Sequence, residues 1–138
     1  DGSELSDRAI DGSIGLAKQL GARITGFVVE PDISLAVTSG PPSSFSDRLK
    51  AHEERNEKHA AKLLGTFKER ADAAGVAFTG IHLTSSSVDQ SIADEAQRAG
   101  CDMIVMVTHG RGTMGELLFG SHTKAVIART KLPLFVLH

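Results

Sequence analysis

Helix-forming and strand-forming segments alternate along the whole sequence, and this alternation constrains the fold more than any other feature. Stretches with an apolar residue every three or four positions predict amphipathic helices. The run from Met103 to Val107 is apolar throughout, which is typical of a strand buried on both faces of a sheet. The expected order is helix 3–20, strand 23–30, helix 47–74, strand 76–84, helix 88–98, strand 103–107, helix 114–129 and strand 134–137.

This order predicts a single α/β domain over residues 1–138, with an open parallel sheet and helices on both faces. A helix comes first, whereas a strand normally feeds the first helix of such a fold. We therefore expect a short apolar strand ahead of Asp1. Residues 31–44 hold three prolines and several serines, and they predict a long surface loop.

The composition argues against several classes of function. The 138 residues include 15 Lys and Arg against 17 Asp and Glu, without a basic run, so a nucleic-acid surface is not expected. No apolar run reaches the roughly 18 residues that a membrane span needs. Cys101 is the one cysteine, which suits a reducing cytoplasm and predicts a buried strand residue rather than a reactive thiol. We expect a cytoplasmic protein.

A glycine-rich loop leaves strand 103–107 and enters the last predicted helix. Ligands of open α/β sheets bind at such junctions, because glycines and a helix amino end present backbone N–H groups to an anion. The dinucleotide pattern G-x-G-x-x-G begins at Gly110, but the next strand has no carboxylate for a ribose. A P-loop spacing ends at Gly120, but Ser121 follows where that motif needs lysine. We reject both motifs.

A third pattern covers the same residues, since Gly110 is followed by nine residues and then by Gly120-Ser121. This frame resembles the signature of the universal stress protein family, which is G-x-x-G, nine residues and G-S/T. The opening residues 1–6 look like that family's first loop, and residues 104–106 and 132–136 are also similar. The likeness extends over the whole chain.

The resemblance implies a Rossmann-like sheet of five parallel strands, and dimers that pair through the last strand, Leu134–Leu137. An apolar strand at a sheet edge is a site of aggregation unless another chain covers it, which agrees with a dimer. In members that bind nucleotide, the resemblance implies ATP or AMP at the glycine loop, with Mg²⁺ as a candidate companion. The residues implied are Asp1 at the ribose, Val28 and Met106 at the adenine, and Gly110, Gly120, Ser121 and Thr123 at the phosphates.

Two positions depart from the family's pattern. Val107 stands where the signature has its first glycine, and a β-branched side chain there would crowd the ribose or a phosphate. Residues 85–88 lack the family's usual Gly-x-Pro. Three functions therefore stay open: a homodimeric stress-response protein that binds adenine nucleotide, a family member without nucleotide that acts as an interaction module, and a slow ATP hydrolase.

Catalytic and metal-binding residues are not assigned. The sequence shows no nucleophile elbow and no identifiable general base, so catalysis lacks support. His52 and His59 lie two turns apart on helix 47–74, and they predict a solvated helix face rather than a metal site.

Overall fold

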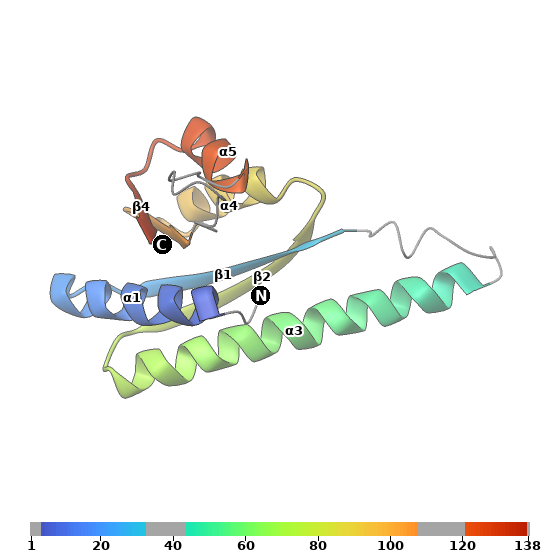
Figure 1. Ribbon diagram of the computed structural model, residues 1–138, viewed down its shortest axis with the longest axis horizontal. Coiled ribbons are helices and arrows are strands. Elements are labelled where there is room, and N and C mark those ends of the chain that lie inside the picture. The colour runs from blue at the N-terminus through green and yellow to red at the C-terminus, as the bar shows by residue number, and fades with distance from the viewer. Residues whose placement is uncertain (1–3, 33–43, 108–120, 138) are drawn as a thin grey trace, which may run out of the picture.

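The computed structural model describes residues 4–32, 44–107 and 121–137, and these residues form alternating helices and strands (Figure 1). The alternation predicted from the sequence is confirmed, although residues 114–120 of the last predicted helix lie outside the described part. No helix in the described part is both long and apolar enough to cross a bilayer. The elements are α1 (Glu4–Leu20), β1 (Ile24–Pro31), α3 (Phe45–Ala73), β2 (Phe78–Ser85), α4 (Val88–Arg98), β3 (Ile104–Val107), α5 (Ser121–Arg129) and β4 (Leu134–Leu137).

The strands form two parallel ladders. β1 pairs with β2 along its whole length, beginning with Ile24 opposite Phe78. β3 pairs with β4, beginning with Ile104 opposite Leu134. β1 and β3 belong to different sheets and are not paired to each other. The parallel pairing is therefore as predicted, whereas a single sheet of five strands is not confirmed.

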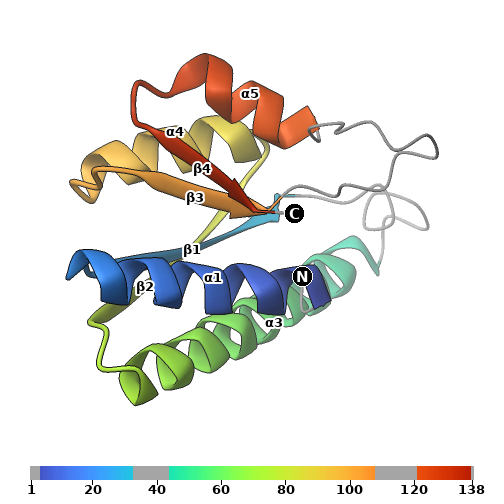
Figure 2. The ribbon, with the colours of Figure 1, turned by 60° about the vertical axis from the view of Figure 1, so that its left-hand side comes forward.

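Helices cover both faces of the strands, as the sequence predicts. α1 and α3 lie on one side, and α4 and α5 lie on the other (Figure 2). α1 contacts β1, β3 and β4, so it bridges the two sheets on its face. α4 contacts β1, β2 and α5 on the opposite face. The two sheets are thus held in one α/β sandwich by helices rather than by a shared ladder.

The sequence of α1 explains both its packing and its end. Ile10, Ile14 and Ala17 recur at spacings of three and four residues, and all three are buried. The helix ends at Gly21, whose φ of +62° lies in the left-handed region that glycine adopts without a steric penalty. Gly100 ends α4 in the same way, with a φ of +66°. Glycine in this conformation just after the last turn is a common way for a helix to end.

The main apolar core lies between α1, α3 and the β1–β2 ladder. Two aromatic rings, Phe67 of α3 and Phe78 of β2, pack against it with centroids 4.8 Å apart and planes inclined by 45°. At the rim, the Arg70 guanidinium donates to the carboxylates of Asp7 and Asp11 at 2.8 and 3.2 Å, which ties α3 to α1. The buried members of the core are Ile10, Ile14, Ala17, Ala71 and Val76.

Candidate functional site

The carboxyl ends of the strands and the amino ends of α1, α4 and α5 lie at one end of the molecule (Figure 2). At this end the chain passes from β3 toward α5. Each helix amino end carries partial positive charge, because its first backbone N–H groups have no partner within the helix. The arrangement therefore favours an anionic ligand at this end.

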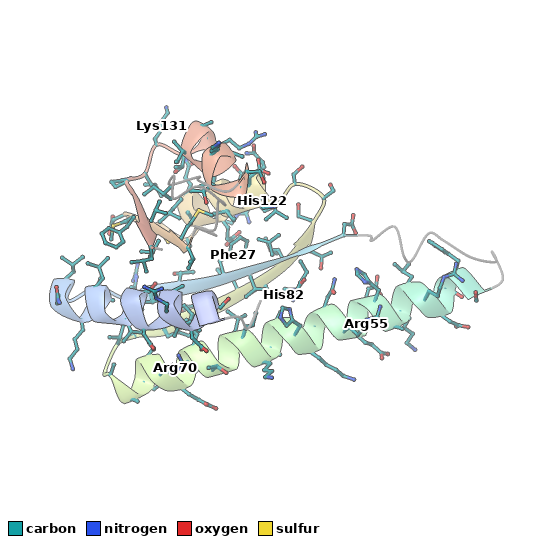
Figure 3. The ribbon with its side chains drawn as sticks, viewed as in Figure 1. Phe27, Arg55, Arg70, His82, His122 and Lys131 are labelled. Atoms are coloured by element: carbon teal, nitrogen blue, oxygen red, sulfur yellow. The ribbon has the colours of Figure 1, made fainter. Side chains whose placement is uncertain are left out.

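The amino end of α5 is the best-defined part of the candidate site. Ser121, its first residue, is exposed, and its first turn carries no Asp or Glu. His122 and Lys124, also in that turn, are exposed, and His122 is labelled in Figure 3. The positive end of the helix dipole is therefore not neutralised by a carboxylate of its own first turn. A phosphate beside Ser121 would meet backbone N–H groups and a hydroxyl.

Thr123 lies differently from the serine two residues before it. It is only 2% exposed and shares the inner face of α5 with Val126, which is fully buried. Ser121 is therefore the α5 hydroxyl that solvent reaches. The phosphate contact predicted for Thr123 stays a prediction, and its burial favours Ser121 over Thr123 for that role.

The end of β3 brings together two of the residues selected from the sequence. Met106 and Val107 are half-buried and line a cavity between β3 and β1. Val28 of β1 is half-buried opposite His82 of β2 and does not line this cavity; its neighbour Phe27 lines it instead (Figure 3). The structure therefore places Met106 and Val107 at a shared cavity and leaves Val28 outside it.

Three further predicted contacts fall outside the described residues. These are Asp1, expected at the ribose, and Gly110 and Gly120, expected at the phosphates. Their roles stay predictions.

A contact that sequence reasoning missed holds α5 against α4. The Arg129 guanidinium donates to the Asp89 carboxylate at 2.7 Å and to the Gln90 side-chain oxygen at 2.8 Å. A hydrogen bond from its own backbone N–H lowers the pKa of Asp89, and Arg129 and His122 lower it further. No local pattern could reveal this contact, because 40 positions separate Arg129 from Asp89.

A second missed contact lies at the carboxyl end of β1. Glu30 and His59 of α3 approach to 2.6 Å between Oε1 and Nδ1. His52 instead lies 3.2 Å from the side-chain nitrogen of Asn56. The two histidines of α3 thus have separate partners. Among the residues that the structure describes, no three His, Cys, Asp or Glu side chains are grouped to hold a metal ion.

Comparisons with a family model and with related proteins point to the same family. The model of the universal stress protein family matches residues 1–138, the whole sequence. The chain is 27% identical to universal stress protein YxiE of Bacillus subtilis over 143 residues, covering 99% of this chain and 93% of that protein. It is 28% identical to stress response protein NhaX of the same organism, with 99% and 92% covered.

Solved structures share the fold at low sequence identity. Hypothetical protein MJ0577 superposes with a TM-score of 0.76 at 20% identity, covering 99% of this chain and 90% of that one. A universal stress protein in complex with cAMP gives 0.66 at 20% identity, with 100% and 90% covered. One from Archaeoglobus fulgidus in complex with dAMP gives 0.62 at 14%, with 99% and 90% covered. These likenesses establish the α/β fold.

Proposed function

The chain belongs to the universal stress protein family, and from that premise we propose that it binds an adenine nucleotide, ATP or AMP, where β3 leads toward α5. The observation that carries the proposal is the amino end of α5, with its exposed Ser121 and a first turn free of carboxylates. The cAMP and dAMP complexes of two structural neighbours support an adenine nucleotide as the ligand class.

In the proposed complex, the phosphates lie against the amino end of α5 and accept hydrogen bonds from the exposed Ser121 and from the backbone of Gly110 and Gly120, and the buried Thr123 is the less favoured contact. The adenine contacts proposed are Met106, which lines the cavity, and Val28, which lies on β1 outside it, and Asp1 meets the ribose. Mg²⁺, where present, would neutralise part of the phosphate charge. Helix N–H groups and a hydroxyl bind phosphate without any chemical step, so the proposed role is binding rather than catalysis.

Calorimetric titration with ATP and AMP, with and without Mg²⁺, tests this proposal. Ser121→Asp places a negative charge where the phosphates would lie, so we expect about tenfold weaker binding or worse, from charge repulsion at short range. Ser121→Asn is the matched control, because asparagine is similar in size to aspartate but neutral. We expect it to cause a smaller loss of affinity. An absence of heat at millimolar ligand, or equal binding by both variants and the wild type, would refute nucleotide binding at this end.

We further infer that the protein acts in the stress response as a cytoplasmic homodimer, signalling through its conformation or its partners. The outer edge of β4 has no ladder partner in the described part of the chain, and Phe135 on that strand is 44% exposed. Pairing with the same strand of a second copy would cover this edge. The free Cys101 thiol is compatible with a reducing compartment.

Analytical ultracentrifugation tests the dimer. Phe135→Lys adds a charge to the proposed interface and should shift the protein toward monomer. Phe45→Lys, at the exposed start of α3, should leave the dimer intact. A monomeric wild type at micromolar concentration would exclude the homodimer.

Val107 supports a second candidate function, in which the protein acts as an interaction module and binds no nucleotide. This residue ends β3 and lines the cavity at the proposed site. If its side chain excludes the ligand, Val107→Gly should create or strengthen ATP binding. Tight binding by the wild type would remove this candidate.

A further inference from the structure

The amino ends of α4 and α5 both lie at the end of the molecule where we propose nucleotide binding (Figure 2), and the two helices pack against each other. Their first turns differ in charge. Asp89 stands in the first turn of α4 and accepts a hydrogen bond from its own backbone N–H, whereas the first turn of α5 holds no Asp or Glu. A carboxylate at a helix amino end offsets the positive end of the dipole. An anion is therefore attracted to α5 more strongly than to α4.

One face of α5 connects its amino end to Asp89. His122, Val126 and Arg129 are spaced four and three residues apart, which places them on the same face of the helix. Val126 is fully buried, and the Arg129 guanidinium donates to Asp89 and Gln90 of α4. His122 lowers the pKa of Asp89, as a nearby positive charge does, so it lies within electrostatic reach of that carboxylate. Asp89 thus interacts with both ends of α5.

The carboxylate of Asp89 would act on any anion bound at the amino end of α5. A charge within reach of His122 is also within reach of a phosphate beside Ser121, and two negative charges repel each other through space. Arg129 limits this repulsion, because its guanidinium holds the Asp89 carboxylate at 2.7 Å. One negative and one positive charge are therefore balanced next to the proposed phosphate position.

We propose that Asp89 is a specificity-determining residue of the nucleotide site, whose carboxylate disfavours ligands of high negative charge, and that Arg129 limits this effect. The inference rests on the proposed function, because it concerns the affinity of the same site. Asp89 acts through space and not by contact with the nucleotide. Its effect therefore grows with the number of phosphates: it is strongest for ATP, weaker for AMP and absent for adenosine.

Calorimetric titration of charge variants with ATP, AMP and adenosine tests the proposal. Mg²⁺ is left out, because it would neutralise part of the phosphate charge. Asp89→Asn removes the negative charge with little change of shape, so ATP should bind about twofold to fivefold more tightly, AMP should gain less and adenosine should be unaffected. Arg129→Gln leaves the carboxylate uncompensated and should weaken ATP binding. Both effects should shrink at high salt, which screens exposed charges.

The double variant Asp89→Asn with Arg129→Gln separates charge from structure. It breaks the contact between α4 and α5 just as Arg129→Gln does, but it leaves the net charge of the protein unchanged. We expect its ATP affinity to return close to that of the wild type. If the contact matters only because it holds α5 in place, the double variant will bind ATP as weakly as Arg129→Gln alone.

An NMR titration of the Asp89 carboxylate needs no nucleotide, so it tests the electrostatic coupling separately from the proposed function. His122→Gln removes the positive charge and should raise the pKa of Asp89. Lys124→Gln is the matched control, because it removes a positive charge from the same turn but from another face of α5. It should raise the pKa of Asp89 less than His122→Gln does.

Four results would overturn the proposal. They are an unchanged pKa of Asp89 in His122→Gln, equal ATP affinity in Asp89→Asn and the wild type, an equal gain for ATP and adenosine in Asp89→Asn, and a double variant as weak as Arg129→Gln. A wild type that binds none of the three ligands refutes the proposed function, and the specificity role fails with it. A raised pKa of Asp89 in His122→Gln would then still show that the coupling between α4 and α5 exists.

Discussion

The two halves of the chain bury different kinds of side chain. The first half, residues 4–85, encloses a continuous apolar cluster that Phe67 and Phe78 extend. The second half, residues 88–137, buries the apolar residues Ala93, Ile104 and Val126. It also buries Glu95 and Thr123, the polar residues found buried in the described part of the chain.

This difference indicates that one half of the chain mainly stabilises the fold and the other half carries the candidate ligand site. A buried polar group costs free energy unless a hydrogen bond compensates for it, whereas buried apolar area stabilises directly. The ladder of the first half is also longer, with eight residues in β1 against four in β3. We infer that the first half supplies most of the folding free energy, and that the second half presents the amino end of α5 to a ligand.

The largest effect is expected from removing an aromatic ring in the first half. Phe67→Ala should lower the free energy of unfolding by about 3 kcal/mol, because it empties space against the main cluster. Phe45→Ala, at a position that is 38% exposed on the same helix, should cost less than about 1 kcal/mol. Urea denaturation of both variants measures the contrast. Equal losses of unfolding free energy in the two variants would contradict the inference that this cluster stabilises the first half.

An intermediate effect, with opposite signs at two positions, is expected for glycine substitutions in the first half. A Cβ on Gly26 would lie 2.5 Å from Cζ of Phe78, so Gly26→Ala should destabilise by about 1–3 kcal/mol. A Cβ on Gly15 would meet no atom within 4 Å, and alanine favours the helix, so Gly15→Ala should stabilise by about 0.5–1 kcal/mol. If both variants shift the melting temperature in the same direction, the predicted clash between residue 26 and Phe78 would be wrong.

The smallest effect is expected in the second half, at the contact between Asp89 and Arg129. The pKa of Asp89 is lowered from 3.8, so its carboxylate contributes stability above that pH, and the contribution is lost as the pH falls through the lower pKa of the folded state. Asp89→Asn should therefore melt slightly below the wild type at pH 7, and the difference should shrink as the pH falls below 3.8 toward the lowered pKa of the folded state. A difference independent of pH would mean that the charge of Asp89 does not matter.

The sequence predicted the features that depend on local pattern. The apolar periodicity of residues 3–20 predicted a helix there, and α1 spans Glu4–Leu20. Contacts between distant residues could not be predicted, because Arg129 meets Asp89 only after α5 packs against α4, and His59 meets Glu30 only after α3 packs against β1.

The candidate site was predictable in outline only. The Gly110–Ser121 frame indicated the strand-to-helix junction, and the structure shows an exposed Ser121 at the start of α5. The burial of Thr123 could not be read from that frame, because it depends on how α5 packs against α4.

The most direct test of the central claim is an NMR titration of the protein with AMP, following the backbone amides. Binding at the proposed end should shift the amide signals of residues 104–107 and 121–124 in the second half and of Val28 beside the adenine, with small changes along the rest of the β1–β2 ladder. No shifts at millimolar AMP, or shifts confined to residues 24–31 and 78–85, would contradict the claim that the second half carries a nucleotide site.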